Sequence, residues 1–410
     1  MLVVGAGPAG TTVAERLARR GHDVLVLEEH AKVGHPVQCA GLVSARALEL
    51  AGTRSMVRAA VHGATVVAPS LRALSFKAPE PRAFVIDRAG LDIALADKAA
   101  RAGARFATGV RFDGLNGAPN GSARARATDS AGHSVEYQAR LVVGADGVTS
   151  AVARAFRLRR PVEILPAFEA EFPHSPGDPD QVEVYLGNDL APGLFGWWIP
   201  DGEGGARVGV AVRAGPVSAR AYYDRLVQQI SLRLGAPLRN ATSLIASGIP
   251  IGTVPRTHGH RVLLVGDAAA QVKPLSGGGI YTGMRGAEIA AEVADAALRA
   301  GEPTAASLAG YDDRWRAELG TEFQRALYLR KIFTRLSDPD MERLLEALEA
   351  SGMREAIVAF GDIDFPTHVA RRLLRQSPSL VRLFPKALGA WLGSSDPRAP
   401  ALDPGPRRNA

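Results

Sequence analysis

The chain has 410 residues, of which 46% are hydrophobic and 22% are charged, so it is able to bury a large core as a globular protein. Its single cysteine excludes an intrachain disulfide and a cysteine-based metal cluster, and we expect a cytoplasmic protein without a metal site. The net charge of +7 favours anionic partners, but no basic run interleaved with aromatic residues suggests a nucleic-acid partner. No apolar run reaches the roughly 18 residues of a membrane span.

The N-terminus carries a dinucleotide-binding pattern. Residues 2–28 read LVVGAGPAGTTVAERLARRGHDVLVLE, which predicts a strand, a glycine turn, a helix and a second strand. Gly5, Gly7 and Gly10 give G-x-G-x-x-G, which permits a tight turn, a close backbone approach to a pyrophosphate and close helix packing. Glu28 ends the second strand, where a partner for a ribose hydroxyl belongs. FAD and NAD remain candidates, and the acid disfavours NADP.

Two later segments favour FAD. Residues 261–291 predict a strand, then Asp267, then the three successive glycines at 277–279 opening a helix. Asp267 can bind a ribityl hydroxyl, and a helix N-terminus at the glycines can stabilise the anion of reduced flavin. Residues 139–154 predict another strand that leads through Asp146 into a helix.

These motifs resemble a known group of flavoproteins. The glycine turn, GADG in the middle of the chain and GDAA followed by P and GGG are similar to the p-hydroxybenzoate hydroxylase-type FAD fold. Within it, PVQCAGLVS at 36–44 and GDIDFP at 361–366 resemble the geranylgeranyl reductase family, which includes digeranylgeranylglycerophospholipid reductase-like and menaquinone-tail reductase-like members. The resemblance implies reduction of polyprenyl double bonds by reduced FAD.

The motifs and the resemblance together define the expected cofactor site, in which Cys39, Ala40, Gly41, Arg88 and Val110 rest on the resemblance alone. The expected cofactor-binding residues are Gly5, Gly7, Ala9, Gly10, Glu28, Cys39, Ala40, Gly41, Arg88, Val110, Asp146, Asp267, Gly277, Gly278, Gly279 and Ile280.

Cys39 is the expected catalytic residue. The resemblance places its segment beside the isoalloxazine ring, where the thiol is a candidate proton donor or positioning group. The alternative is a small buried hydrophobe, as free cysteines usually are.

FGWWIP at 195–200 is the expected substrate-binding segment. It resembles the family's Y-x-W-x-F-P motif, in which aromatic residues line the isoprenoid channel, and it keeps Trp197 and Pro200 but has Phe195 in place of the tyrosine. Trp198 is included with these three as a substrate residue, although paired tryptophans in a strand also serve as core packing.

The expected fold class is α/β, or α+β overall: a p-hydroxybenzoate hydroxylase-like protein with a Rossmann-type FAD-binding domain, an antiparallel-sheet substrate domain and a helical C-terminal region. The expected units are residues 1–65, 82–160 and 250–300 for FAD, 66–81 and 161–249 for substrate, 301–393 as helices, and 394–410 as a disordered tail. Residues 368–393 contain both basic and apolar residues. This mixture is typical of an interfacial surface that binds anionic headgroups, and also of a pair of surface helices.

The expected function is FAD-dependent saturation of a geranylgeranyl or other polyprenyl chain, borne by a lipid, a diphosphate or a quinone tail. A flavin monooxygenase or halogenase of the same fold and a non-catalytic prenyl-lipid-binding flavoprotein are the alternatives. The external reductant is left open between NADPH, NADH and ferredoxin, which would be an electron-donor protein, because no second G-x-G-x-x-G is present. We expect a monomer with peripheral contact at the inner face of the membrane.

Overall fold

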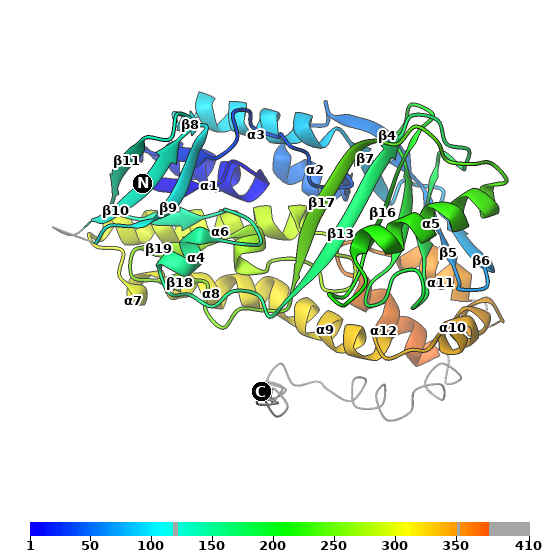
Figure 1. The fold of residues 1–410 in the computed structure, drawn as a ribbon. Helices are drawn as coiled ribbons and strands as arrows, with labels where there is room; N and C mark the ends of the chain where they lie inside the picture. The colour runs from blue at the N-terminus through cyan, green and yellow to red at the C-terminus, as the bar shows by residue number, and fades with distance from the viewer. Residues whose placement is uncertain (118–121, 351–352, 377–410) are drawn as a thin grey trace.

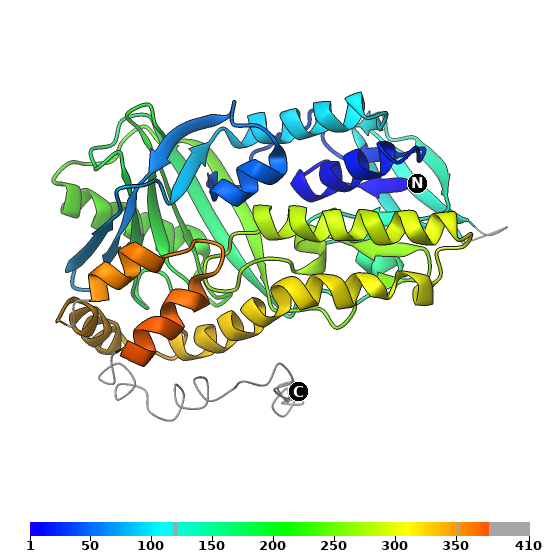
Figure 2. The ribbon, with the colours of Figure 1, turned by 180° about the vertical axis from the view of Figure 1, so that it is seen from behind.

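The computed structural model describes residues 1–117, 122–350 and 353–376, and Figures 1 and 2 show its elements from opposite sides. The expected tail at 394–410, and the expected helical region after residue 376, lie outside the described residues. No helix in the described ranges has both the length and the apolar character that crossing a bilayer requires.

The N-terminal part is built on a six-stranded, mainly parallel sheet. Its strands, in spatial order, are β18 His258–Gly259, β19 Val262–Leu264, β12 Val142–Gly144, β1 Leu2–Val4, β2 Leu25–Glu28 and β8 Arg105–Thr108. Side chains alternate between the two faces of a strand, so Val3 packs toward helices α1 (Pro8–Ala18) and α6 (Ile280–Arg299). Leu2 packs on the opposite face, against the sheet of β9, β10 and β11. That sheet consists of β9 Val110–Leu115, β10 Ala123–Asp129 and β11 Ser134–Ala139.

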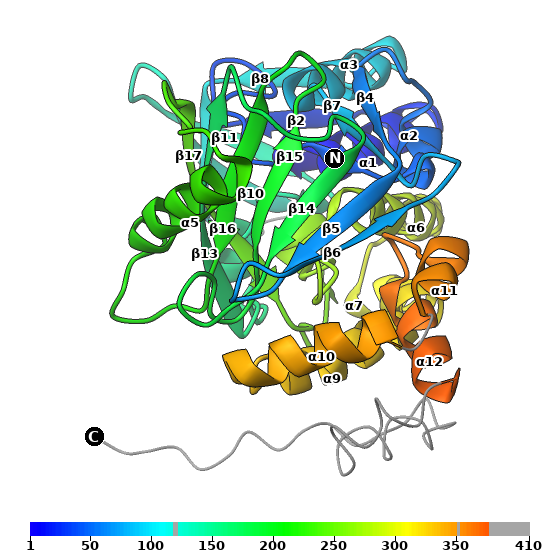
Figure 3. The ribbon, with the colours of Figure 1, turned by 90° about the vertical axis from the view of Figure 1, so that its right-hand side faces the viewer.

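A seven-stranded sheet forms the other half of the molecule (Figure 3). Its strands, in spatial order, are β17 Thr242–Ile251, β13 Glu163–Phe172, β16 Ala206–Ala211, β15 Gly196–Pro200, β14 Gln181–Tyr185, β5 Gly63–Val67 and β6 Ala73–Lys77. Neighbours are antiparallel as expected, except that β5 and β14 run parallel. Helix α5 (Ala219–Leu234) covers one face, and the other face lines a large cavity.

The remaining elements connect these two halves or cover them. A three-stranded sheet consists of β3 Leu42–Val43, β7 Ala83–Ile86 and β4 Val57–Val61. The other helices are α2 Ala45–Ala51, α3 Arg88–Arg101, α4 Ala151–Ala155, α7 Ala305–Leu308, α8 Gly310–Trp315, α9 Thr321–Phe333, α10 Asp338–Ala350, α11 Met353–Phe360 and α12 Pro366–Gln376. A short 3₁₀ helix covers Gly266–Ala269, and a π-helical turn covers Arg316–Gly320.

The C-terminal helices close the open edge of the seven-stranded sheet. Residues of α10 and α11, among them Leu345 and Ile357, pack on Leu74 and Phe76 of β6, and Figure 2 shows these helices beside that strand. The expected α/β class with a largely antiparallel second sheet and a helical C-terminal region is confirmed. The exact domain limits stay a prediction, and β17 runs across the limit expected at 249/250.

Candidate active site

The turn between β1 and α1 requires its glycines. An added Cβ on Gly5, whose φ is +100°, would lie 2.3 Å from the carbonyl oxygen of Ala145. An added Cβ on Gly10 would lie 2.0 Å from the carbonyl oxygen of Gly5, so α1 can pack this closely only with a glycine there. An added Cβ on Gly7 would meet nothing within 4 Å, so the backbone of Gly7 is open to the space in front of it.

That space belongs to a hollow of about 630 Å³, which we call the N-terminal hollow. Gly5, Gly7, Glu28, Arg88, Asp92, Val110 and Asp146 are among its lining residues. Glu28 accepts hydrogen bonds from the backbone nitrogens of Ala6 (2.9 Å) and His30 (3.0 Å), so its carboxylate also holds the glycine turn in place. The Asp146 carboxylate accepts from Ser150 Oγ at 2.6 Å and Val152 N at 2.9 Å, which fixes the start of α4.

A second hollow, the central cavity, lies between the two large sheets and has a volume of about 670 Å³. It meets the N-terminal hollow at five residues that line both: Gly7, Gln38, Arg88, Ala145 and Gly147. Arg88 pairs with Asp92 one turn further along α3. The buried atoms Arg88 Nε and Asp92 Oδ1 have no hydrogen-bond partner among the described residues, so polar atoms at this junction are left for a bound ligand.

One end of the central cavity collects the expected flavin-binding residues. These are Ala9, Cys39, Ala40, Gly41, Asp267, Gly277, Gly278, Gly279 and Ile280. Among the described residues no hydrogen bond to the Asp267 carboxylate is found, and burial raises its pKa to about 6 against the opposing charge of Arg88. An added Cβ on Gly279 would lie 3.1 Å from Asp267 Oδ1, which keeps the start of α6 close to this carboxyl group.

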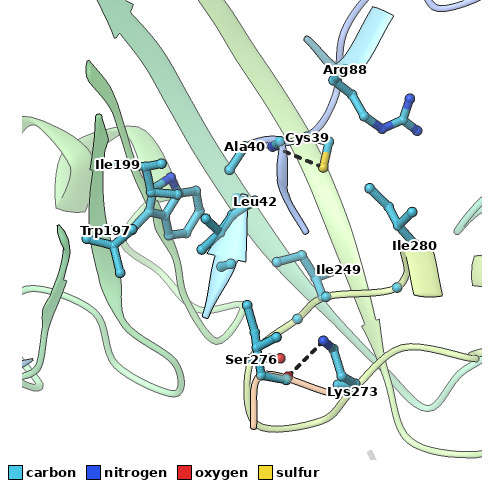
Figure 4. Close-up of a pocket in the computed structure, with 18 of the residues that line it drawn as sticks. Cys39, Ala40, Leu42, Arg88, Trp197, Ile199, Ile249, Lys273, Ser276 and Ile280 are labelled. Carbon is cyan, nitrogen blue, oxygen red and sulfur yellow. Dashed lines mark hydrogen bonds between the residues drawn. The ribbon is translucent and has the colours of Figure 1, made fainter. Parts of the chain in front are cut away.

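The loop that carries Cys39 is fastened to the seven-stranded sheet by Arg207 of β16. Arg207 Nη1 donates to the carbonyl oxygens of Ala40 at 2.8 Å and Ile86 at 3.0 Å, and its Nε donates to Glu171 at 3.1 Å. An added Cβ on Gly41, whose φ is +70°, would lie 2.2 Å from Nη1, so the loop needs glycine here. Figure 4 shows Cys39 at the cavity, with its Sγ accepting from the backbone of Gly41.

The GDIDFP segment reaches the same cavity from the C-terminal region. Lys273 Nζ donates to Asp364 Oδ1 and to the carbonyl oxygen of Ile363, both at 2.9 Å, and both charged side chains are buried. Because an added Cβ on Gly278 would lie 2.9 Å from Lys273 Cε, the ion pair also packs under the glycines that open α6. The sequence contained no signal for this pairing, since the two charges lie 91 residues apart.

The expected substrate segment is only partly at the cavity. Phe195 and Trp197 line it, and Trp198 does not. Successive side chains of β15 point to opposite faces, so Trp198 is buried under α5, where its Nε1 donates to Ser175 Oγ at 2.8 Å. Pro200 ends β15 and is buried, but it is also absent from the cavity lining. Trp198 is therefore corrected to a core residue, and Ile199 joins Trp197 at the cavity.

The structure adds a carboxyl group that the sequence analysis missed. Glu169 of β13 lines the cavity, is 4% exposed, and accepts a hydrogen bond from Trp197 Nε1 at 2.7 Å. Burial raises the pKa of Glu169 to about 7, although the Trp197 hydrogen bond and the charge of Arg207 oppose the shift. The available signal was an acidic residue flanked by apolar neighbours, within residues expected to form antiparallel strands.

These residues fit FAD. The N-terminal hollow and the central cavity meet at the glycine turn and at Arg88. This arrangement suits a dinucleotide whose pyrophosphate lies between the adenosine and the flavin. The unpartnered Arg88 Nε is suited to a phosphate oxygen, and the open backbone at Gly7 leaves room for that phosphate. The start of α6 would face the flavin end, where a helix N-terminus favours negative charge.

Comparison with known proteins agrees with this geometry. A family model described as an FAD binding domain matches residues 1–318. Digeranylgeranylglycerophospholipid reductase 2 of Methanopyrus kandleri is 32% identical over 93% of this chain and 97% of that protein. The corresponding reductase of Methanothrix thermoacetophila is 33% identical over 85% of this chain and 91% of that protein.

Solved structures share the fold. A geranylgeranyl bacteriochlorophyll reductase-like protein of Thermoplasma acidophilum has a TM-score of 0.81 at 24% identity, covering 94% of this chain and 98% of that chain. The myxobacterial chondrochloren halogenase CndH has a TM-score of 0.64 at 20% identity, covering 89% and 91%.

Fold and site define an FAD-dependent oxidoreductase with the p-hydroxybenzoate hydroxylase-like fold. Within this class, the chain belongs to the geranylgeranyl reductase family, with its digeranylgeranylglycerophospholipid reductases as relatives over nearly the whole length.

Proposed function

We propose that this protein uses reduced FAD to saturate carbon-carbon double bonds of geranylgeranyl-type chains that carry a phosphate-bearing headgroup. The observation that carries the proposal is the central cavity, which continues from the flavin end into a mostly apolar space bounded by the seven-stranded sheet and by α11. When bound, reduced FAD supplies the hydride for such a reduction.

The far part of the cavity suits a prenyl chain. Its apolar lining includes Ala64, Phe76, Val182, Val184, Ile199, Ile245, Ile249, Ile357 and Val358. These side chains come from strands across the seven-stranded sheet, including both edge strands, and from α11, so a flexible hydrocarbon can lie against the sheet with one double bond at the flavin end. Cys39 and Trp197 both line this cavity, as Figure 4 shows, and would orient the double bond that reacts.

A cluster of arginines is suited to the headgroup. A separate hollow of about 650 Å³ is lined by Arg325, Phe360, Asp362, His368, Arg371, Arg372 and Arg375. Burial lowers the pKa of the Arg371 guanidinium, and the positive charges of Arg375 and Arg325 lower it further. In the described part of the chain these arginines form no ion pair with an acidic side chain, since Asp362 of the same lining pairs with Arg46. Arginines that repel one another in this way favour a phosphate group.

The hollow lined by these arginines, which we call the arginine hollow, is separated from the central cavity by one short segment. Gly361 and Ile363 line the cavity, whereas Phe360 and Asp362, from the same short segment, line the arginine hollow. A lipid with its tail in the cavity could therefore keep its phosphate at the arginines. Peripheral contact with an anionic membrane, from which such a lipid must be taken, belongs to the same proposal. The electron donor and the monomeric state stay predictions.

An anaerobic substrate comparison tests the proposal. The protein, reduced with dithionite, is mixed in turn with a digeranylgeranyl glycerophospholipid, geranylgeranyl diphosphate and a polyprenyl quinone, and flavin reoxidation is followed by absorbance. We expect the two phosphate-bearing compounds to reoxidise the flavin faster than the quinone. Reoxidation by oxygen alone, with none of the three compounds reacting, would favour a hydroxylase or halogenase; a preference for the quinone would contradict the headgroup assignment.

A further inference from the structure

Glu169 lies on β13, the strand next to the β17 edge of the seven-stranded sheet, and its side chain lines the central cavity. In β13 it pairs with Gly209 of β16, and Gly209 pairs in turn with Trp197 of β15. An added Cβ on Gly209 would lie 2.4 Å from Trp197 Cζ2, so the indole lies across the glycine toward Glu169. The glycine thus lets two side chains on nonadjacent strands meet over the cavity.

Only one oxygen of the Glu169 carboxyl group has a hydrogen-bond partner among the described residues. Trp197 Nε1 donates to Oε2 at 2.7 Å, and among the described residues no hydrogen bond to Oε1 is found. An indole N–H is a donor only, so it can hold the carboxyl group in either protonation state without supplying a proton to it. Oε1 is left to carry a proton at the cavity.

The groups around Glu169 set its pKa so that the carboxyl group keeps its proton up to about neutral pH. Burial raises the pKa of Glu169 to about 7, the Trp197 bond and Arg207 lower it, and Glu171 raises it. The other titratable groups around the cavity are Cys39, His62, Arg82, Arg88, Glu183, Asp267 and Lys273. Three of these are already in ion pairs: Arg88 with Asp92, Lys273 with Asp364 and Glu183 with Arg233.

We propose that Glu169 is the acid that protonates the prenyl double bond during its reduction. This inference rests on the proposed function. As the π bond breaks, one carbon gains a C–H bond from hydride and the other gains a C–H bond from the proton on Glu169 Oε1. Glu169 is left as a carboxylate, which the Trp197 hydrogen bond and the charge of Arg207 stabilise, and water restores its proton. Cys39 then shapes and positions the reacting segment without supplying the proton.

Glu169→Gln is the direct test, because its amide oxygen still accepts from Trp197 while the acidic proton is lost. In anaerobic single turnovers with a geranylgeranyl substrate, we expect flavin reoxidation to slow by about 10²-fold or more, with unchanged reduction by dithionite. The wild-type rate should fall as the pH rises through about 7, and this limb should be absent from Glu169→Gln. Glu203→Gln, on an exposed turn, is the matched control.

A structural role for Glu169 predicts a different pattern. If Glu169 only positions Trp197, Glu169→Gln will react at the wild-type rate with the same pH limb, and only Glu169→Ala will be slow; that result overturns the proposal. If Cys39→Ser instead abolishes the reaction and its pH limb, the thiol is the acid and the assignment to Glu169 is wrong.

A measurement without substrate separates this inference from the proposed function. Infrared difference titration of the protein should show a protonated-carboxyl band that disappears with a midpoint near pH 7, and that is missing in Glu169→Gln. If no prenyl compound reacts with the wild type, the proposed function fails whatever the titration shows. If prenyl compounds react but this band is absent, the assignment to Glu169 fails.

Discussion

Arg207 Nη1 donates a hydrogen bond to the carbonyl oxygen of Ala40 at 2.8 Å and so joins the substrate sheet to the loop that carries Cys39. The same guanidinium holds Ile86 and Glu171, and it lies close enough to Glu169 to influence its ionisation. One buried arginine therefore influences both the position of the thiol and the stability of the Glu169 carboxylate.

Replacing Arg207 should affect both groups. Arg207→Met leaves one buried and one partly buried carbonyl oxygen without this donor, and we expect a loss of roughly 1–3 kcal/mol in unfolding free energy. Displacement of the Cys39 loop should lower the rate of substrate-dependent flavin reoxidation by about tenfold or more. Denaturant unfolding and single-turnover kinetics measure the two effects, with the exposed Arg105→Met as control. An unchanged rate would show that the loop keeps its position without Arg207.

Arg88 should govern retention of the cofactor. Arg88→Lys keeps a positive charge beside Asp92 but removes the planar fork that offers several donors to phosphate oxygens. We expect FAD to bind about tenfold more weakly, a loss of about 1.4 kcal/mol. Titration of the FAD-free protein with FAD measures this change. Arg101→Lys, at the exposed end of the same helix, should bind FAD as the wild type does.

The two tryptophans of β15 should respond oppositely. Trp198→Ala empties a buried space under α5, and we expect it to cost about 3–5 kcal/mol of unfolding free energy while the folded protein keeps its substrate preference. Trp197→Phe should cost less stability but move the alkaline limb of the reaction to higher pH, because the Trp197 hydrogen bond lowers the pKa of Glu169. Equal effects on stability would contradict the assignment of their faces.

Substitutions in the arginine hollow should weaken substrate binding and leave kcat unchanged. For the double variant Arg371→Ser/Arg375→Ser we expect KM for a prenyl phospholipid to rise by about tenfold at constant kcat, because the lost contacts are the same in ground and transition states. A prenyl alcohol without a phosphate should react equally well with both proteins. Arg239→Ser, on an exposed loop elsewhere in the chain, is the control. Equal losses for the alcohol and the phospholipid would exclude a headgroup site.

Glu169 should also make stability depend on pH. Its folded-state pKa of about 7 is raised above the value of 4.5 for an ordinary glutamate, so the folded protein holds the proton more tightly than the unfolded chain does. The contribution of Glu169 to unfolding free energy is therefore largest below about pH 4.5 and falls as the pH rises to about 7, by up to about 3 kcal/mol. Denaturant unfolding across this range should show a weaker pH dependence for Glu169→Gln than for the wild type.

The strands and helices around the glycine motifs could be predicted from the sequence because their signals are local. Gly5, Gly7 and Gly10 lie within one turn, and the motif around Asp267 runs directly into α6. The family resemblance predicts that Cys39 lies beside the flavin, which periodicity could not predict. It gave no position for GDIDFP, which the structure brings to the central cavity.

Contacts between strands that lie far apart in the sequence could not be predicted from the sequence. The faces of Trp197 and Trp198 depend on the register of β15, and a shift of one residue would exchange them. Glu169, Arg207 and the Lys273–Asp364 pair acquire their roles only when β13, β16 and the C-terminal region come together around the cavity.

The most direct test of the central claim is the mass of the product formed without oxygen. Protein reduced with dithionite is mixed anaerobically with a digeranylgeranyl glycerophospholipid, and the lipid is weighed by mass spectrometry as the flavin reoxidises. The account predicts a gain of two hydrogen atoms for each flavin reoxidised. A lipid of unchanged mass beside a flavin that stays reduced until oxygen enters would contradict it.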